Sequence, residues 1–468
     1  MLTCIDKSYL GKTIFVIVTI SLFILIGFFI ADYPIVFLII ILLLISILVF
    51  VFPVFAIYLV LITALLSGTP GIENYISSIR AVSIIGFVAI MRIVFDIVRF
   101  KGSIDNKILF KPYIFWWIIF LFWGFISVIW SPNRLAWVSG IYSFLSMTSL
   151  VIIVTTQLKT TKSIQQLIFF ISIFAMVSSG MAILSGLRVF GPIDVNSRLA
   201  ITGGLENPNY LAGCLALITP FTLGLIKNQT RLISKILASI ILMVMIVGSI
   251  ITLSRGGLIS LSIGIGTFIL INLVYEKNKK NFALAILPIV LVYLSYEISI
   301  RFFNFDLLSR FNEAILEVTR GQSVRAMLMK IAWLTTLNHP ILGLGLGNFI
   351  SDFPSLSSEY HILQYSNSPI AVHNAYLSVS SELGFVGLFL FIIALFSTLK
   401  ELAKIHKKKA INGFIFVDSI FAAFLAGLSL GVFNELNQNK YFWFVIGLII
   451  VFGIRSDEIH GSMIKEVD

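Results

Sequence analysis

The sequence predicts an all-α fold: a polytopic integral membrane protein of about 12 to 14 transmembrane helices. Hydrophobic residues make up 58% of the 468 residues, and charged residues make up only 12%. The mean hydropathy is +1.03, far above the range of soluble globular domains. Apolar runs of about 17 to 22 residues, long enough to cross a hydrocarbon core of about 30 Å as helices, recur along the chain. We therefore expect residues 1–468 to form a single transmembrane domain.

Polar breaks divide the apolar runs into individual spans. The first run, TIFVIVTISLFILIGFFIA, lacks a small-residue cleavage site and leads directly into further spans, so we expect a retained helix rather than a signal peptide. Only Pro53 and its neighbours separate the second run from the third, so these two could form one broken element. The expected spans lie near residues 13–31, 34–51, 53–67, 81–98, 113–130, 137–156, 164–187, 209–226, 232–252, 257–275, 282–299, 374–399, 413–434 and 441–455.

The net charge of +11 would suggest a nucleic-acid partner in a soluble protein, but its placement here indicates membrane topology. Lysine and arginine are concentrated in every second connection between spans, so these connections lie on one side of the membrane. We assign that side to the cytoplasm and expect both termini there as well. The residues are Arg99, Lys101, Lys107, Lys111, Lys159, Lys162, Lys227, Arg231, Lys235, Lys277, Lys279, Lys280, Lys400, Lys404, Lys407, Lys408 and Lys409. We expect membrane lipids, and no nucleic acid, as partners.

One connection on the opposite side, from about residue 300 to residue 373, is too long to be a passive turn. Its segment LLSRFNEAILEVTRGQSVRAMLMKIAWLTTL has apolar residues at helical spacing, which favours a helix lying along the outer membrane face. We expect residues 300–373 to form an extracytoplasmic (periplasmic) loop that contains helices.

The stretch AVHNAYLSVSSELGFVG, residues 371–387, places His373 where this loop enters the next span. An ionisable group there is either functional or cavity-lining, or else a histidine wetted at the membrane interface. Ser380, Gly384 and Gly387 form a small-residue face that would let another helix approach closely. Such packing would hold the histidine still, as a general base requires.

Three arginines are candidates for binding an anion on the same side. Arg255 in TLSRGGL follows one span, and Gly256 and Gly257 permit a tight turn and close backbone approach. Arg325 in GQSVRAM lies in the long loop, and Arg198 is a further outward cation. A guanidinium stays charged and binds oxyanions through a planar fork of donors. The plain alternatives are an interfacial anchor for Arg255 and a solvated helix charge for Arg325.

Other polar and glycine-rich stretches have simpler interpretations. Asn207, Pro208 and Asn209 in GGLENPNYLAG form a turn before a span, with Asn209 a candidate helix cap. NHPILGLGLGNF does not have the spacing GxGxxG, so a nucleotide site is not expected there. The chain has no P-loop, HExxH, Asp-x-Asp pair or Cys/His cluster, so we expect no metal and no cofactor. Cys4 and Cys214 are not expected to form a disulfide.

The pair His373-Asn374, nine further residues and Gly384-x-x-Gly387 together resemble the H[NSQ]-x9-GxxG signature of the bacterial O-antigen ligase family, which is related to the Wzy-type O-antigen polymerases. SRGG, ENPNYLAG, the WSPN turn and HPILGLGLGNF also resemble that family. The resemblance runs from about residue 120 to about residue 435.

The resemblance implies a metal-independent, inverting glycosyltransferase with a GT-C-type helical fold and no cofactor. It would transfer a glycan en bloc from an undecaprenyl diphosphate carrier to an acceptor hydroxyl, on lipid A core or another surface acceptor, at the outer face of the bacterial inner membrane. Its partners would be this donor, a glycan or lipid acceptor, and other polysaccharide-assembly proteins. His373 would be the base that activates the acceptor, while Arg255 and Arg325, with Arg198 as a further candidate, would hold the diphosphate. The residues expected to shape the site are Asn374, Asn207, Asn209, Gly384 and Gly387.

Two other functions stay open from the sequence. A Wzy-type polymerase would join carrier-linked repeat units, and it shares the donor and the proposed base with a ligase. A transporter of lipid-linked sugars would need charged groups within several helices, and the spans contain a few: Arg92, Asp96, Glu382 and Asp418. Arg92 and Asp96 are spaced to pair on one helix, and the distinctive polar residues gather on one face. The sequence therefore favours transfer over transport.

Overall fold

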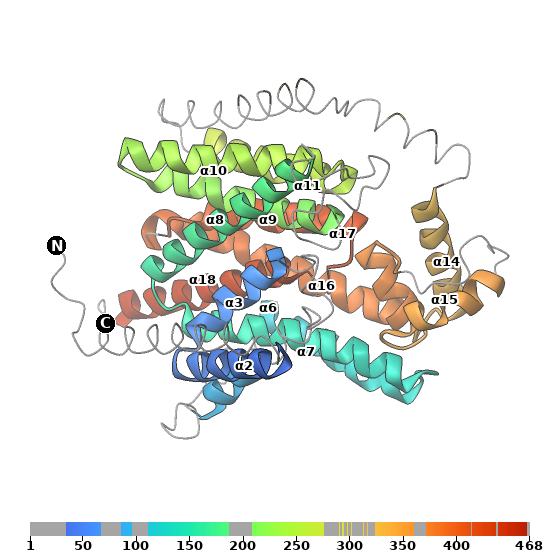
Figure 1. Ribbon diagram of the computed structural model, residues 1–468. Coiled ribbons are helices and arrows are strands. Elements are labelled where there is room, and N and C mark those ends of the chain that lie inside the picture. Colours follow the sequence, from blue (N-terminus) through green and yellow to red (C-terminus); the bar gives the residue numbers. More distant parts are fainter. Residues whose placement is uncertain are drawn as a thin grey trace.

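The computed structural model describes residues 34–66, 86–95, 111–186, 208–275, 323–359, 371–412, 414–436 and 439–465, with a few single residues between 290 and 316. Within these ranges all regular secondary structure is helical, which confirms the all-α fold. Figure 1 shows the long helices gathered in one bundle, with α14 (Val324–Asn338) and α15 (Asn348–Glu359) at the right-hand end. The last helix, α18 (Lys440–Lys465), ends on the opposite side.

The helix boundaries follow the apolar runs closely. α2 (Pro34–Val51) and α3 (Val54–Leu66) break at Pro53, because proline lacks the N–H that would continue the first helix. The remaining long elements are α6 (Pro112–Ile126), its 3-10 extension η1 (Ser127–Ile129), α7 (Arg134–Gln157), α8 (Thr161–Gly186), α9 (Pro208–Asn228), α10 (Leu232–Ile251), α11 (Arg255–Tyr275), α16 (Ala375–Asn412) and α17 (Val417–Phe433).

Seven helices in the described part of the chain are long and apolar enough to cross a membrane, which confirms a polytopic membrane protein. Three shorter apolar helices, Val54–Thr63, Gly86–Phe95 and Val417–Phe433, coincide with further expected spans. The expected spans near 13–31 and 282–299 lie outside the described residues, apart from single positions. The total of 12 to 14 spans therefore stays a prediction.

The centre of the bundle is α9, against which α8, α10, α11 and α17 pack. Small residues on α9 let its neighbours approach closely, since in lipid helices associate through packing rather than through the hydrophobic effect. A Cβ at Gly213 would lie only 3.0 Å from Leu430 of α17, and a Cβ at Gly257 of α11 would overlap Ala212 of α9. This packing fixes the positions of α11 and α17. The beginning of α11 and the end of α17 both lie at the candidate site.

A cluster of aromatic rings joins α6, α16 and α18. The Trp117 ring lies 5.9 Å from that of Phe391 and 5.2 Å from that of Trp443, measured between centroids. The indole N–H of Trp117 donates a 3.0 Å hydrogen bond to Oγ1 of Thr398, so the one polar atom of this buried side chain is satisfied. The middle of α16 is thereby held against two neighbouring helices.

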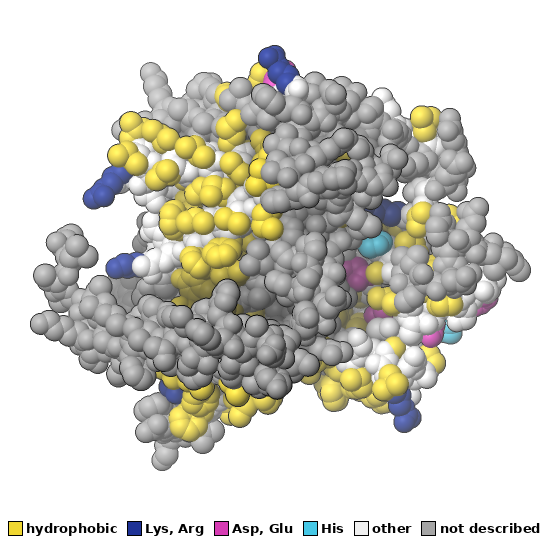
Figure 2. Space-filling view, in the orientation of Figure 1, with side chains coloured by type: hydrophobic (Ala, Val, Ile, Leu, Met, Phe, Trp, Pro, Cys, Tyr) yellow, Lys and Arg dark blue, Asp and Glu magenta, His cyan; other side chains and the backbone are white. Residues whose placement is uncertain are grey.

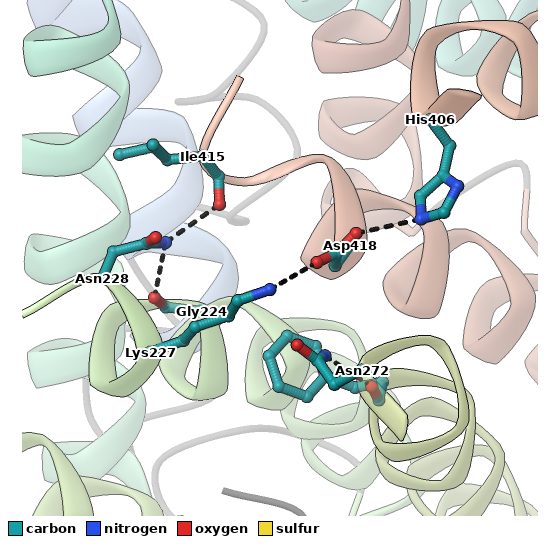
Figure 3. A network of polar contacts seen from close by, with 8 residues as sticks. Gly224, Lys227, Asn228, Asn272, His406, Ile415 and Asp418 are labelled. Carbon is teal, nitrogen blue, oxygen red and sulfur yellow. Dashed lines mark hydrogen bonds and ion pairs between the residues drawn. The ribbon is translucent and has the colours of Figure 1, made fainter. Parts of the chain in front are cut away.

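The two ends of the bundle differ in chemistry. At one end a buried polar network joins α9, α16 and α17 (Figure 3). Oδ2 of Asp418 lies 2.7 Å from Nζ of Lys227, and Oδ1 lies 3.1 Å from Nε2 of His406. Asn228 donates to the carbonyls of Gly224 and Ile415 at 2.8 and 2.9 Å. The other end, which we call the His373 end, carries α14, α15 and the first residues of α11 and α16.

The surface shows the same contrast (Figure 2). On the left of the face drawn, hydrophobic side chains cover much of the surface that is described, as lipid contact requires. On the right, near the α14–α15 end, histidine, acidic and basic side chains meet in a hollow. The polar residues of the candidate site are therefore grouped on one side of the molecule.

Candidate functional site

Gly384 breaks α16 at the His373 end. Its φ of 68° and ψ of −174° are not helical, and they separate a short first part of the helix from its long remainder. The break leaves backbone groups without helical partners, and a loop satisfies them. The N–H of Phe385 donates to the carbonyl of Pro340 at 2.7 Å, and the N–H of Gly345 donates to the carbonyl of Glu382 at 2.7 Å.

The segment that packs against Gly384 is not the helix that the sequence led us to expect. We predicted that Gly384 and Gly387 would let another helix approach, but a Cβ at Gly384 would overlap the backbone of Ile341 and Leu342, which belong to a loop. Gly387 does face a helix, because its Cβ would lie 3.4 Å from Trp123 of α6. Spacing alone could not reveal that one glycine serves a loop and the other a helix.

The glycine run in HPILGLGLGNF is a packing device. Gly343, Gly345 and Gly347 have φ values of 70°, 93° and 76°, a left-handed region that favours glycine. A Cβ at Gly343 would overlap the backbone of Glu382, and a Cβ at Gly345 would lie 2.9 Å from Cα of Ser131. The loop therefore fits tightly between α16 and the turn that joins η1 to α7.

The WSPN turn anchors the same loop. Nδ2 of Asn348 donates to Oγ of Ser131 at 2.6 Å, and Oδ1 of Asn348 accepts from the N–H of Asn133 at 3.0 Å. The indole N–H of Trp130 donates to the carbonyl of Leu342 at 3.0 Å. WSPN, the glycine loop and the break in α16 thus form one packed unit at the His373 end of the bundle.

His373 is held in an unusual backbone conformation just before α16. Its φ is 55°, in the left-handed region that non-glycine residues adopt rarely and that concentrates at functional sites. The next residue, Asn374, caps α16, since its Oδ1 accepts from the N–H of Leu377 at 2.9 Å. Nδ2 of Asn374 donates to the carbonyl of Val432 at 3.0 Å and so ties this segment to the end of α17.

Of the three predicted arginines, Arg325 lies near His373, and Arg255 lies near Arg325. Burial and then electrostatic repulsion from Arg325 lower the pKa of His373 below its usual value. Burial and then repulsion from Arg255 lower the pKa of Arg325. Such repulsion acts between groups that are close in space, so the fold brings α11, α14 and the start of α16 together at this point.

A sharp turn and close helix packing place Arg255 at the first position of α11. The turn is made by Leu253, whose φ is 53°, and not by the glycines that follow Arg255. Gly256 and Gly257 instead lie in the first turn of the helix, where a Cβ at Gly256 would overlap Phe433 at the end of α17. The first turn of α11, with Arg255, is thereby packed against the end of α17.

Two carboxylates belong to the same neighbourhood and were not assigned to it from the sequence. Oε2 of the buried Glu382 accepts a 2.8 Å hydrogen bond from the N–H of Gly347. Glu435, in the α17–α18 connection, is close to the N–H of Val372, the residue before His373. Burial raises the pKa of Glu435 to about 7, and the Val372 N–H opposes that rise. The two carboxylates are close enough to repel each other electrostatically.

Glu435 could have been suspected from one signal only: it is an acidic residue in the short connection between two apolar runs on the expected side. Glu382 was noted only as a charge within a span. Among the described residues no group of three or more His, Cys, Asp or Glu side chains is arranged to hold a metal ion.

The other predicted site residues are less informative. Arg198 and Asn207 lie outside the described residues. Asn209 is half-buried, and because α9 begins at Pro208 it is the second residue of the helix rather than its cap. The structure therefore brings together His373, Asn374 and two arginines of the predicted set.

The charges that favoured a transporter have local roles where they are described. Arg92 lies 5.5 Å from the centroid of one phenylalanine ring and 5.7 Å from another, and Asp96 is outside the described residues. Asp418 pairs with Lys227 at the opposite end of the bundle from Glu382. These groups do not form one cluster along the bundle.

Fold and site together define a class: a helical membrane protein with a histidine, arginines and carboxylates gathered at one end of its bundle. The family model described as O-antigen ligase matches residues 211–392, a range that includes Arg255, Arg325 and His373. The predicted resemblance to the O-antigen ligase family is thereby confirmed for residues 211–392. It supports a function of the ligase or polymerase type in a glycosyltransferase-like membrane protein. No protein with a curated description matches the chain.

Proposed function

We propose that this protein transfers a glycan en bloc from undecaprenyl diphosphate to an acceptor hydroxyl, as a ligase, at the outer face of the bacterial inner membrane. The acceptor would be lipid A core or another surface molecule. The observation that carries the proposal is the grouping of a half-buried histidine with two arginines at one end of a membrane bundle. In this orientation the basic connections face the cytoplasm and the His373 end faces the periplasm.

His373 would act as the general base. Because its pKa is lowered, the imidazole is neutral at pH 7 and can accept a proton. The acceptor hydroxyl gives this proton to the imidazole while its oxygen forms a bond to the anomeric carbon of the glycan. The bond from that carbon to the carrier diphosphate breaks, and its electron pair leaves with the diphosphate. A single displacement of this kind inverts the anomeric centre.

Arg255 and Arg325 would bind the diphosphate. Holding two guanidinium groups close together in a partly buried site is unfavourable unless an anion lies between or beside them. A diphosphate is such an anion, and it gains negative charge as the glycan leaves. Fixed arginines stabilise that charge most where water is partly excluded, so the displacement needs no metal ion.

The alternative reaction of the same class is polymerisation. A Wzy-type polymerase would use the same donor and the same base, and its acceptor would be the sugar end of another carrier-linked repeat unit. The two reactions differ in product, since one links the glycan to a different molecule and the other lengthens it on its carrier.

The test is transfer by the purified protein in proteoliposomes that contain an undecaprenyl diphosphate glycan and, separately, lipid A core, without added metal or nucleotide. The proposal expects a glycan–lipid A core product and an inverted linkage. Longer carrier-linked glycans would instead identify a polymerase. Movement of the donor across the bilayer without any new glycosidic bond would overturn the proposal in favour of transport.

A further inference from the structure

The exposed faces of α14 and α15 differ in chemistry, although the two helices pack on the same core. Their inner faces share one apolar cluster, to which α14 contributes Leu328 and α15 contributes Phe353. On the exposed face of α14, Trp333 and Leu337 are 43% and 48% exposed. The exposed face of α15 instead carries small polar side chains, namely Ser351, Ser355 and Ser358. Water suits the face of α15 and does not suit that of α14, so the two faces meet different surroundings.

The exposed face of α14 continues an apolar stripe on α16. This stripe begins directly after the break at Gly384 and recurs every three or four residues, as one face of a helix does; its members are Phe385, Phe389, Ile392 and Phe396. Large apolar side chains on the outside of a membrane-spanning helix are what lipid contact requires. The ring of Trp333 meets that of Phe385 edge-on, with the centroids 6.1 Å apart. The lipid-facing surface of α16 therefore extends onto α14.

Packing against α16 fixes which face of α14 points outward. On the buried side, Oγ1 of Thr336 lies 3.0 Å from Oγ of Ser380, within hydrogen-bond distance. Lys330, Trp333 and Leu337 lie on the opposite, exposed side at helical spacing, and we call these three residues the α14 edge. Turning this edge inward would break the buried contact between the two hydroxyls.

The composition and direction of α14 indicate the boundary between lipid and water. Tryptophan and lysine are typical of that boundary, because an indole has an apolar body with one polar atom and a lysine stem can lie along lipid while its charge reaches the phosphates. Figure 1 shows α14 running across the ends of the long helices, whereas α10 and α18 run along the bundle. A helix that lies in the interface plane has this direction and this kind of exposed face. The partner that fits the α14 edge is therefore a phospholipid surface.

We propose that the α14 edge lies in lipid at the headgroup boundary of the leaflet at the His373 end, and that this contact holds Arg325 at the depth of a lipid-linked diphosphate. Arg325 precedes Trp333 on the same helix by about 12 Å along the axis. Because α14 runs across the bundle, this separation lies mainly in the plane of the membrane and changes the depth little. The role of Arg325 rests on the proposed function, while the lipid contact of Trp333 and Leu337 does not.

The first test locates the α14 edge with a nitroxide on a single cysteine, in proteoliposomes of phosphatidylethanolamine and phosphatidylglycerol. Cys4 is replaced by serine, and Cys214 is buried and so protected from the label. Labels on Trp333→Cys and Leu337→Cys are expected to collide more with oxygen, which dissolves in lipid, than with a water-soluble nickel complex, at a depth of about 5 to 10 Å. Ser355→Cys, on the exposed face of α15, is the matched control and should collide mainly with the nickel complex.

The second test measures kcat and the donor KM in the transfer assay described above. Trp333→Ser removes the interfacial ring, so we expect the donor KM to rise about 10-fold with kcat little changed, because Arg325 loses its fixed depth. Trp333→Phe keeps an apolar ring and should keep a donor KM close to that of the wild type. Ser355→Ala is the control and is expected to change neither constant. Thermal unfolding is measured for every variant.

The outcomes separate the lipid contact from the function. Labels on the α14 edge that are reached mainly by the nickel complex would overturn the lipid contact, whatever the transfer rates. Labels in lipid with an unchanged donor KM in Trp333→Ser would overturn the role of this contact in placing Arg325. If the labels lie in lipid and the wild type makes no transfer product, the proposed function fails and the lipid contact stands. If a Trp333 variant does not fold, Leu337→Cys and Leu337→Gln decide the same two questions.

Discussion

The backbone of Gly384 lies directly against the carbonyl oxygen of Ile341, with no room for a Cβ between them. This contact joins the break in α16 to the glycine loop, and the loop in turn is bonded to the WSPN turn. The position of His373, just before the same helix, therefore depends on a loop about thirty residues earlier in the chain.

The first prediction concerns Gly384→Ala. An alanine would have to adopt a φ of 68° and would clash with Ile341, so we expect a loss of about 2 kcal/mol or more in the free energy of unfolding and a matching loss of activity. Gly266→Ala in α11 is the control, because a Cβ there meets nothing within 4 Å. That control should be neutral or stabilising by up to about 1 kcal/mol. Equal thermal unfolding of the two variants in detergent would contradict the description of the break.

The second prediction concerns the pKa of His373. Arg325 lowers this pKa, so Arg325→Gln should raise it and move the acid limb of the kcat profile to higher pH. The acid limb moves to higher pH because a base with a higher pKa stays protonated, and therefore inactive, up to a higher pH. The same variant should weaken donor binding.

The control for that experiment is Arg134→Gln, an exposed arginine at the start of α7. Its profile should overlay that of the wild type. An unshifted acid limb in Arg325→Gln would mean that the two side chains do not interact in the working protein.

The third prediction separates capping from positioning at Asn374. Asn374→Ala removes a helix cap, which costs about 1 kcal/mol of stability, and also removes the bond to Val432. We expect kcat to fall well beyond what the loss of folded protein explains. Thr160→Ala removes the cap of α8, where Oγ1 of Thr160 accepts from the N–H of Ser163 at 3.1 Å, and it should cost similar stability with normal kcat. If Asn374→Ala, like Thr160→Ala, lost stability but kept a normal kcat, the role of Asn374 would be that of a helix cap alone.

The fourth prediction concerns the polar network in Figure 3. Asp418→Ala removes the shared partner of Lys227 and His406 in a region where these side chains are largely buried, so a loss of about 3 to 5 kcal/mol is expected. Glu401→Gln is the control, since its partner Lys404 has a side chain 59% exposed and the pair should be worth less than about 1 kcal/mol. A small effect of Asp418→Ala on thermal unfolding would show that this network does not stabilise the bundle.

Much of the fold could be predicted because lipid imposes simple demands on sequence. A span must be long, apolar and helical, so the expected runs at 34–51 and 232–252 coincide almost fully with α2 and α10. The break in α16 was not predicted, because the spacing of Gly384 indicates a helix-packing face and does not reveal the loop that packs against it. Breaks of this kind depend on contacts between distant segments.

The candidate site was predicted only in part, for a related reason. Hydropathy and loop charges indicated that His373, Arg255 and Arg325 share one side, but not that they are close together. Glu435 belongs to no motif, and its closeness to the Val372 N–H depends on how α17 packs against α16. Charge pairing between distant segments is a property of the fold and not of local spacing.

The most direct test of the central claim is the transfer rate of His373→Ala beside that of His339→Ala, an exposed histidine at the end of α14. Both variants are compared with the wild type in proteoliposomes at matched amounts of folded protein. We predict that His373→Ala loses about 100-fold or more of the transfer rate while still binding the lipid-linked donor, and that His339→Ala stays active. Normal transfer by His373→Ala would contradict the catalytic role given to this histidine.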